Sequence, residues 1–178
     1  DPVTSVLEDQ PYQYQVVIDD PDFAYGDQIY EAGFISAPAG MSYDLGTNSI
    51  IWSPQNEDVG IHSLEFWVSD LNGGIAYQSY LLEVINVNDP PQIDIPPSLN
   101  FVKGDNLELN CGPYVNDVDS NSFEISVSGN QHIQAVVTGM NILFSCDNWT
   151  GYEVITVTVS DMDTRLTASD QIGVTVLP

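Results

Sequence analysis

Carboxylate side chains are the groups in this sequence that could do the most chemistry. Its 178 residues include 26 Asp and Glu but only 2 Lys and Arg, which gives a net charge of −24 at pH 7. Because carboxylates in such excess repel one another in a compact protein, bound divalent cations, external salt or solvent must offset them. The same balance excludes a nucleic-acid-binding protein, which needs a basic surface, and disfavours an anionic membrane as a partner.

Other groups that could act in catalysis are few. The two histidines are His62, in a strand-like stretch where we expect it to face solvent, and His132, after the turn-like SGNQ. Neither has a Ser or Cys context that suggests an activated nucleophile. A pair of acids can hydrolyse glycosides, but this needs a substantial cleft, which a small sandwich rarely forms. We therefore expect that the chain is not an enzyme, and the scarcity of His and Cys disfavours zinc or copper.

Short strands must position the acids, because helical periodicity is hard to find. In IHSLEFWVSD the side chains of Leu64, Phe66 and Val68 share one face, and Trp67 lies on the other. YEVITVTVSD, SFEISVS and YQYQVVI are similarly alternating or rich in strand-forming residues, and Gly, Pro, Asn and Asp separate them. The length and the hydrophobic content of 43% suffice for two small domains. The sequence predicts an all-β sandwich protein.

An internal repeat indicates two domains. Gly60–Asp70 aligns without a gap with Gly151–Asp161, in both residue identity and alternation. We therefore predict two tandem β-sandwich domains, residues 1–89 and 90–178. The stretch NVNDPP, Asn86–Pro91, is then the joint between them, and its prolines stiffen it and cannot extend a ladder.

The repeat also places acids at corresponding ends of the two copies. Asp20-Pro21-Asp22 recurs as Asp117-Val118-Asp119 after an early strand, and Asp70 recurs as Asp161 after a late strand. If these strands run the same way, the acids of each copy emerge at one end of its sandwich. For the second copy, this is the end that the joint enters. The loops of the first copy that fit its exit end carry Glu8, Asp9, Glu57 and Asp58.

Oxygen-rich side chains of this kind suit calcium. Ca²⁺ takes six to eight oxygens from carboxylates, amides and carbonyls in flexible geometry, whereas Mg²⁺ prefers stricter octahedra and more water. The alternative for any single residue is a turn, because Asp and Asn often bond to their own backbone. Repetition of the whole set around the joint favours calcium, with Asn86, Asn88 and Asp89 between the two groups of acids.

The two cysteines, Cys111 and Cys146, lie in the strand-like stretches LELNCGPY and NILFSCDNW, without a C-x-x-C motif. We predict a disulfide across one sandwich, with two buried free thiols as the alternative. Closing this loop would stabilise the domain by about 4 kcal/mol in the chain-entropy model. A disulfide would also place the protein outside the cytosol. No signal peptide or membrane-length apolar run is present, so we expect a mature segment or an excised piece.

The order of these motifs resembles that of cadherin-like domains in bacterial surface proteins. The first copy is similar to the dystroglycan-type group through LEDQPYQYQV, DDPD, APAGMSYD, TNSIIWSPQNEDVGIHSLEFWVSD and VINVNDPP. The second copy is similar to related repeats of tandem bacterial adhesins through PYVNDVDSNSFEISVSG, NWTG and ITVTVSD. The resemblance covers nearly the whole chain. It implies two seven-stranded Greek-key sandwiches arranged end to end, with Ca²⁺ between successive domains.

The resemblance also implies particular ligands and a function. For the interdomain Ca²⁺ it implies Glu8, Glu57, Asp58, Asn88, Asp89, Asp117, Asp119 and Asp161. It implies that Asp20, Asp22 and Asp70 face a domain upstream of Asp1. The expected protein is a calcium-stiffened stalk or adhesion module, secreted or on a bacterial cell surface. Its expected partners are neighbouring domains of the same or an identical chain, and a cell-surface protein or glycan; membrane insertion is not expected.

Two other functions stay open. Trp67 faces away from the expected core, and a sugar-binding surface could combine it with Tyr30, Tyr43, Tyr77 and Tyr80; Trp52 is expected in the core. Packing within or between domains is the alternative explanation for these aromatic residues. The chain could instead be a subunit of an extracellular filament, assembled head to tail or by lending a strand to an open sheet edge.

Overall fold

The chain folds into two compact β units. The structure is a computed structural model that describes residues 1–26, 29, 31–70 and 72–178. Contacts divide the chain into residues 1–87 and 88–178, here called unit 1 and unit 2. This division falls two residues before the predicted one, because Asn88 and Asp89 make hydrogen bonds to unit 2.

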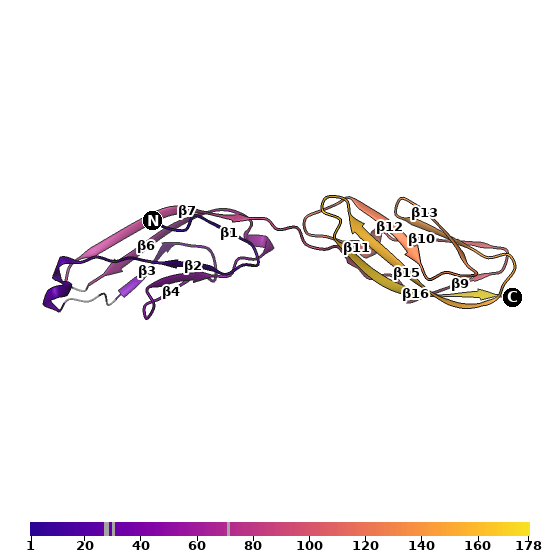
Figure 1. The fold of residues 1–178 in the computed structure, drawn as a ribbon, viewed down its shortest axis with the longest axis horizontal. Helices are drawn as coiled ribbons and strands as arrows, with labels where there is room; N and C mark the ends of the chain where they lie inside the picture. Colours follow the sequence, from indigo (N-terminus) through magenta and orange to yellow (C-terminus); the bar gives the residue numbers. More distant parts are fainter. Residues whose placement is uncertain (27–28, 30, 71) are drawn as a thin grey trace. The chain divides into compact units, whose positions relative to one another are not determined.

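Unit 1 is a sandwich of two sheets (Figure 1). One sheet has the order β1 (Ser5–Leu7), β7 (Ile75–Ile85), β6 (Gly60–Ser69) and β3 (Glu31–Ser36). The other has the order β2 (Tyr12–Gln15), β5 (Ser49–Trp52) and β4 (Ser42–Asp44). Strand β1 is parallel to β7, and the other neighbours are antiparallel. Two short 3₁₀ helices, η1 (Pro21–Tyr25) and η2 (Asn56–Asp58), lie in the connections.

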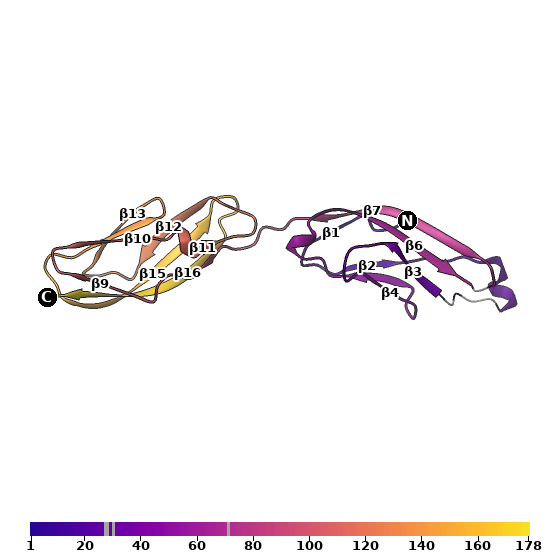
Figure 2. The same cartoon turned by 180° about the vertical axis from the view of Figure 1, so that it is seen from behind.

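Unit 2 repeats this strand order, as Figures 1 and 2 show from opposite sides. Its larger sheet has the order β9 (Ser98–Val102), β16 (Thr167–Leu177), β15 (Gly151–Asp161) and β12 (Phe123–Ser128). Its second sheet has the order β10 (Asn106–Asn110), β14 (Asn141–Ser145) and β13 (Gln134–Thr138). A short ladder joins β8 (Gln92–Ile93) to β11 (Val115–Asn116), with η3 (Gly112–Tyr114) before it. The predicted all-β, Greek-key sandwich class is confirmed, and the chain crosses between sheets in both units.

Alternation along the strands decides which side chains form each core. Leu64 and Phe66 of β6 are buried in unit 1, and Ile155 and Val157 of β15 take the same places in unit 2. Trp52 is also buried, as predicted. Each such side chain stabilises the fold by about 1.5–3 kcal/mol through removal from water. The repeat seen in the sequence is therefore a repeat of one core-forming strand.

The predicted disulfide is wrong, because Cys111 and Cys146 are both free, buried thiols. Each follows the last residue of its strand, β10 or β14, and these strands are antiparallel neighbours. Asn110 pairs with Asn141 and Asn106 with Ser145, so Cys111 lies opposite Met140 at one end of this ladder and Cys146 lies at the other end. At the rise of a strand, this separates the two cysteines by about 20 Å. A disulfide needs Cα atoms within about 7 Å. Burial raises the pKa of Cys111 to about 11, which disfavours a reactive thiolate.

Candidate calcium site

Three segments meet at one end of unit 2 and bring its predicted ligands together. Asp117 and Asp119 follow β11, Asp161 ends β15, and Asn88 and Asp89 begin the unit. Oδ2 of Asp119 accepts the backbone N–H of Asp89 at 2.7 Å. The Asn88 amide donates to Oδ2 of Asp161 at 3.4 Å. We call these five residues the unit 2 acidic cluster, in which the entering chain is hydrogen-bonded to both acidic loops.

Asp161 organises the loop after β15 with its carboxylate, which is fully buried. Oδ1 accepts the N–H groups of Asp163 and Thr164 at 2.9 and 2.7 Å, and Oδ2 accepts that of Leu166 at 3.0 Å. These bonds outweigh the effect of burial and lower the pKa of Asp161, and the bond from the Thr164 N–H contributes most. The Thr164 hydroxyl also accepts the Asn88 amide at 2.9 Å. Sequence reasoning missed Thr164, because no motif marks it.

Asp117 is the member of the cluster with unused acceptor capacity. Its Oδ1 accepts the N–H groups of Asp119 and Ser120 at 2.8 and 2.9 Å, which is the local turn that Asp commonly forms. Its Oδ2 is buried and accepts no hydrogen bond from the described residues. A buried oxygen without a donor costs free energy, so a cation held there would stabilise the unit.

Glu8 is a second fully buried acid, in unit 1. Its Oε1 accepts the N–H of Val87 at 2.5 Å, and its own N–H donates to the Ile85 carbonyl at 3.0 Å. Oε2 is buried without a hydrogen-bond donor among the described residues. Glu8 therefore holds the last residues of unit 1 and keeps one carboxylate oxygen uncompensated.

The resemblance assigns Glu57 and Asp58 to the same calcium site as Glu8, but their surroundings differ from those of Glu8. Oδ2 of Asp58 accepts the N–H of Gln55 at 2.9 Å and so forms part of the capping box of η2. Glu57 is exposed and, with Trp52, lines a surface hollow of about 760 Å³. In the described part of unit 1, no hydrogen bond links either carboxylate to Glu8.

The acids predicted to face upstream lie around one hollow of unit 1. Asp20, Asp22 and Asp70 line a cavity of about 430 Å³. Oδ1 of Asp20 accepts the N–H of Asp22 at 2.8 Å and caps η1. Asp70 is buried, and its Oδ1 accepts the N–H groups of Asn72 and Gly74 at 2.7 and 2.9 Å. These acids are brought together by the fold, and the carboxylates of Asp20 and Asp70 each accept backbone N–H groups of a nearby turn.

The acids in both units are turned mainly toward backbone N–H groups. Among the described residues, no group of three or more His, Cys, Asp or Glu side chains is arranged so that it could already hold a metal ion. Calcium would therefore have to replace some of these hydrogen bonds by coordination. The ligand assignments stay predictions.

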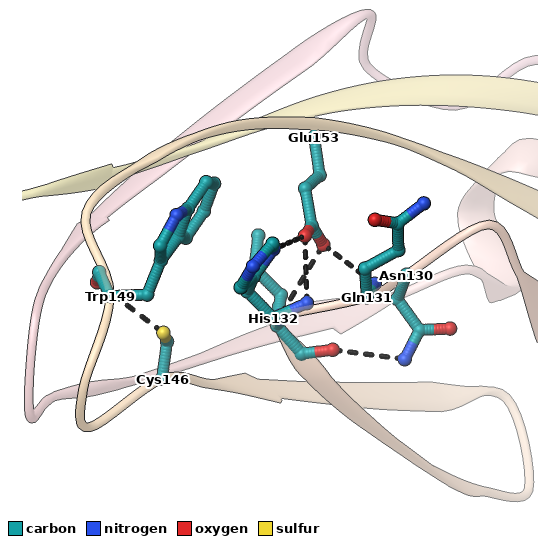
Figure 3. Close-up of polar contacts among 7 residues, drawn as sticks. Asn130, Gln131, His132, Cys146, Trp149 and Glu153 are labelled. Atoms are coloured by element: carbon teal, nitrogen blue, oxygen red, sulfur yellow. Dashed lines mark hydrogen bonds and ion pairs between the residues drawn. The ribbon is translucent and has the colours of Figure 1, made fainter.

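The two histidines have structural partners. Figure 3 shows the ring of His132 facing Trp149 and its Nδ1 directed at Glu153. The Nδ1–Oε1 distance is 2.7 Å, and the His132 and Trp149 rings stack with centroids 4.6 Å apart. His62 does not face solvent as expected, because it shares the inward side of β6, packs edge-on against Trp52 and contacts the Asp58 carbonyl through Nε2. Neither histidine is paired with a Ser or Cys nucleophile by the interactions of the described residues.

Among the described residues of the predicted aromatic set, Trp67 and Tyr77 lie together on an outer face, whereas Tyr43 and Tyr80 pack against other residues. Trp67 lies on the outer face of β6, directly opposite Tyr77, which is 61% exposed. Tyr43 instead packs on Phe66 with ring centroids 4.7 Å apart, and the Tyr80 hydroxyl lies 3.0 Å from that of Tyr12. Tyr30, the remaining member of the predicted set, lies outside the described residues.

Solved cadherin structures share this fold. Human mucin-like protocadherin EC1-2 matches 99% of this chain and 96% of its own, with 13% identity and a TM-score of 0.53. Protocadherin Gamma B2 extracellular cadherin domains 3–6 match at 15% identity and a TM-score of 0.56, over 97% of this chain and 44% of theirs. Human CDH23 EC21-23 matches at 15% identity and a TM-score of 0.54, over 97% and 66%. The chain therefore has a cadherin-like fold, as the motifs predicted.

Other comparisons add little. No protein-family model matches the chain, and no curated protein matches it. An endo-fucoidan hydrolase of glycoside hydrolase family 107 matches at 19% identity and a TM-score of 0.41, a similarity too weak to inform on activity. The chain spans 28% of that enzyme's length. Within the described residues, no helix is both long and apolar enough to cross a membrane.

Proposed function

We propose that the chain is a calcium-binding structural module of an extracellular adhesion protein, of the bacterial cell-surface type that its motifs resemble. The cadherin-like fold supports an adhesion-type module. The observation that carries the calcium proposal is the buried, uncompensated Oδ2 of Asp117 within the unit 2 acidic cluster. Its partners are then neighbouring domains of the same or an identical chain, and a cell-surface protein or glycan.

The chemistry of the cluster supports Ca²⁺ over other metals. Asp117, Asp119 and Asp161 supply carboxylates, Asn88 supplies an amide oxygen, and Asp89 supplies both a carboxylate and a carbonyl. A flexible coordination shell of six to eight oxygens accepts ligands that come from three loops, whereas Mg²⁺ demands near-octahedral order. Glu8, whose Oε2 is buried without a hydrogen-bond donor among the described residues, is in this proposal a calcium ligand at its own place in unit 1. Bound calcium would neutralise acids whose mutual repulsion otherwise opposes folding.

A calcium titration of the full chain by calorimetry, with thermal unfolding of the same sample, tests this function. We expect saturable binding and a stabilisation of about 2.7 kcal/mol at 100 times the dissociation constant. Asp117→Asn should weaken binding by about tenfold or more, because it removes the negative charge of the carboxylate whose Oδ2 has no hydrogen-bond donor. Asp105→Asn, an exposed acid in the turn after β9, is the matched control and should bind as the parent does.

Two results would contradict the proposal. One is the absence of saturable binding at millimolar calcium. The other is an equal affinity in Asp117→Asn and in the parent chain, which would remove the unit 2 acidic cluster from any site found elsewhere. Small-angle scattering with and without calcium would separately test the prediction that calcium stiffens the chain.

A further inference from the structure

The outer face of the larger sheet of unit 1 carries an aromatic pair. Trp67 of β6 lies directly opposite Tyr77 of β7 on this face. On its other side Trp67 lies opposite Gly33 of β3, where a Cβ atom would approach three indole atoms to 3.1–3.4 Å. The indole ring therefore rests against the backbone of Gly33, which is possible because glycine has no side chain. Tyr77 is 61% exposed, and we call the two rings the Trp67–Tyr77 platform.

Unit 2 carries two small hydroxyl residues at the equivalent position. The repeat aligns Trp67 with Thr158, and Tyr77 with Ser169, the residue opposite Thr158 on β16. The hydroxyls of Thr158 and Ser169 lie 2.8 Å apart and are exposed, although residues 92–97 precede the first strand of that sheet. Two hydroxyl residues are thus sufficient for the sheet to form at this place. The sandwich itself does not require the rings of unit 1, which favours a role for them in binding.

The apolar part of this outer face is small. Ile75, which is 55% exposed, borders the platform on one side. On the other side Glu65 and Ser79 form the next cross-strand pair, so polar side chains separate the platform from Leu81. Even when fully exposed, two aromatic side chains offer only about 300–500 Å², whereas a stable protein interface buries about 800 Å² on each partner. The platform is therefore too small for the core of a protein interface and suits a short sugar segment.

The chemistry of the platform suits a neutral sugar. The face of an aromatic ring is weakly negative, so it attracts the C–H groups that line one side of a sugar ring. Glu65 lies two residues before Trp67 on β6, on the same face, and its carboxylate can accept sugar hydroxyl groups in charge-assisted hydrogen bonds. Residues 1–87 include no Lys or Arg, because the two basic residues of the chain are Lys103 and Arg165. Unit 1 therefore repels a sulfated or carboxylated glycan.

We propose that the Trp67–Tyr77 platform is a binding site for a neutral glycan. A sugar ring lies against the indole of Trp67 and the phenol ring of Tyr77, and its hydroxyl groups donate to Glu65. The proposal rests on the adhesion part of the proposed function and assigns its partner as a glycan. The site uses none of the predicted calcium ligands, so glycan binding should not require calcium.

Affinity electrophoresis of the full chain tests the proposal. The chain is run in native gels that contain hydroxyethyl cellulose, galactomannan or dextran as neutral probes, or alginate as an anionic probe. A chelator is present throughout, so that the measurement is separate from calcium binding. We expect retardation that saturates with the concentration of at least one neutral probe. Alginate should not retard the chain, because its carboxylates are repelled by the acidic surface.

Two variants locate the glycan on the platform. Tyr77→Ser should weaken binding by about fivefold or more, because it removes one stacking ring. The double variant Trp67→Thr with Tyr77→Ser copies the pair of Thr158 and Ser169 in unit 2 and should abolish binding. Tyr25→Ser is the matched control and should bind as the parent does, because Tyr25 is an 88% exposed tyrosine of η1, outside the sheet. Thermal unfolding checks that each variant is folded.

Three outcomes would overturn the proposal. The first is that no neutral probe retards the chain, and the second is equal retardation of the parent and the folded double variant. The third is a change of oligomeric state in the double variant, measured by size-exclusion chromatography with light scattering, which would assign the platform to contact between copies of the chain. A chain that binds calcium but no neutral probe would contradict the glycan site alone. A chain that binds a neutral probe but no calcium would contradict the calcium module alone.

Discussion

Asp161 and Glu153 use their carboxylates in the same way, although they lie near opposite ends of β15. Glu153 accepts the N–H groups of Gln131, His132 and Ile133 at 3.1, 2.7 and 3.3 Å, and so fastens this turn to the strand. Figure 3 shows these bonds converging on one carboxylate. At the scale of single residues, many acids of this chain therefore serve as acceptors for backbone groups of turns.

The dependence of folding stability on pH should reveal how much the charged Glu153 carboxylate contributes. Burial by itself would raise its pKa, but the hydrogen bonds from the turn outweigh burial and lower it. A lowered pKa in the folded state means that the charged form stabilises the fold above the unfolded pKa, and that this contribution is lost as pH falls through the folded pKa. Glu153→Gln should cost about 1 kcal/mol at pH 7 and should flatten the loss of stability between about pH 5 and 3.

Urea unfolding across this pH range measures the effect. Glu108→Gln, an exposed residue of β10 in the same unit, is the control and should unfold as the parent does. An unchanged pH profile in Glu153→Gln would mean that the turn is held by other groups.

At the scale of elements, strand direction decides which side chains can meet. Cys111 and Cys146 follow the ends of antiparallel neighbours and are kept apart, whereas the acidic loops after β11 and β15 meet at one end of unit 2. The pairing of Asn88 and Asp89 with those loops likewise follows from where the strands end. Alternation in a sequence shows which face of a strand is buried, but not which end of which neighbour lies beside it.

Whether Cys111 and Cys146 are free thiols is a direct test of the antiparallel pairing of β10 with β14. We expect both cysteines to react with a thiol reagent in denaturant and neither to react rapidly in the folded protein, because both are buried. The melting temperature should be the same with and without reductant. Cys146→Ala should then cost about 1 kcal/mol of packing, not the roughly 4 kcal/mol of a lost cross-link. A melting temperature lowered by reductant would show a disulfide.

At the scale of the whole molecule, the net charge of −24 opposes the folded state. Monovalent salt screens this repulsion without occupying a specific site. We expect NaCl to stabilise the chain by on the order of 1 kcal/mol, or about 4–8 °C for a domain of 60–100 residues. The rise in stability with NaCl should be gradual and should not saturate at micromolar salt. This behaviour distinguishes screening by NaCl from binding of calcium at a specific site. Differential scanning calorimetry in NaCl, with chelator present, makes the measurement, and an unchanged melting temperature would contradict it.

The sequence by itself determined the fold class and the strands that build each core. Alternation in IHSLEFWVSD and YEVITVTVSD, and their alignment as a repeat, depend only on local periodicity, which the sheets preserve. The acids Asp117, Asp119 and Asp161 could be named for the same reason, since Asp161 ends β15 and the other two lie in the loop after β11. Local patterns were therefore sufficient wherever the structure depends on neighbours in the chain.

Tertiary structure decided the contacts between segments that are distant in sequence. The separation of Cys111 from Cys146 and the bond from Asn88 to Thr164 both depend on strand pairing. In unit 2 the N–H of Ile95 likewise donates to Oδ2 of Asp170 at 2.9 Å, although the two residues are 75 positions apart. No periodicity encodes such differences, because they arise from which segment happens to pack against which strand edge.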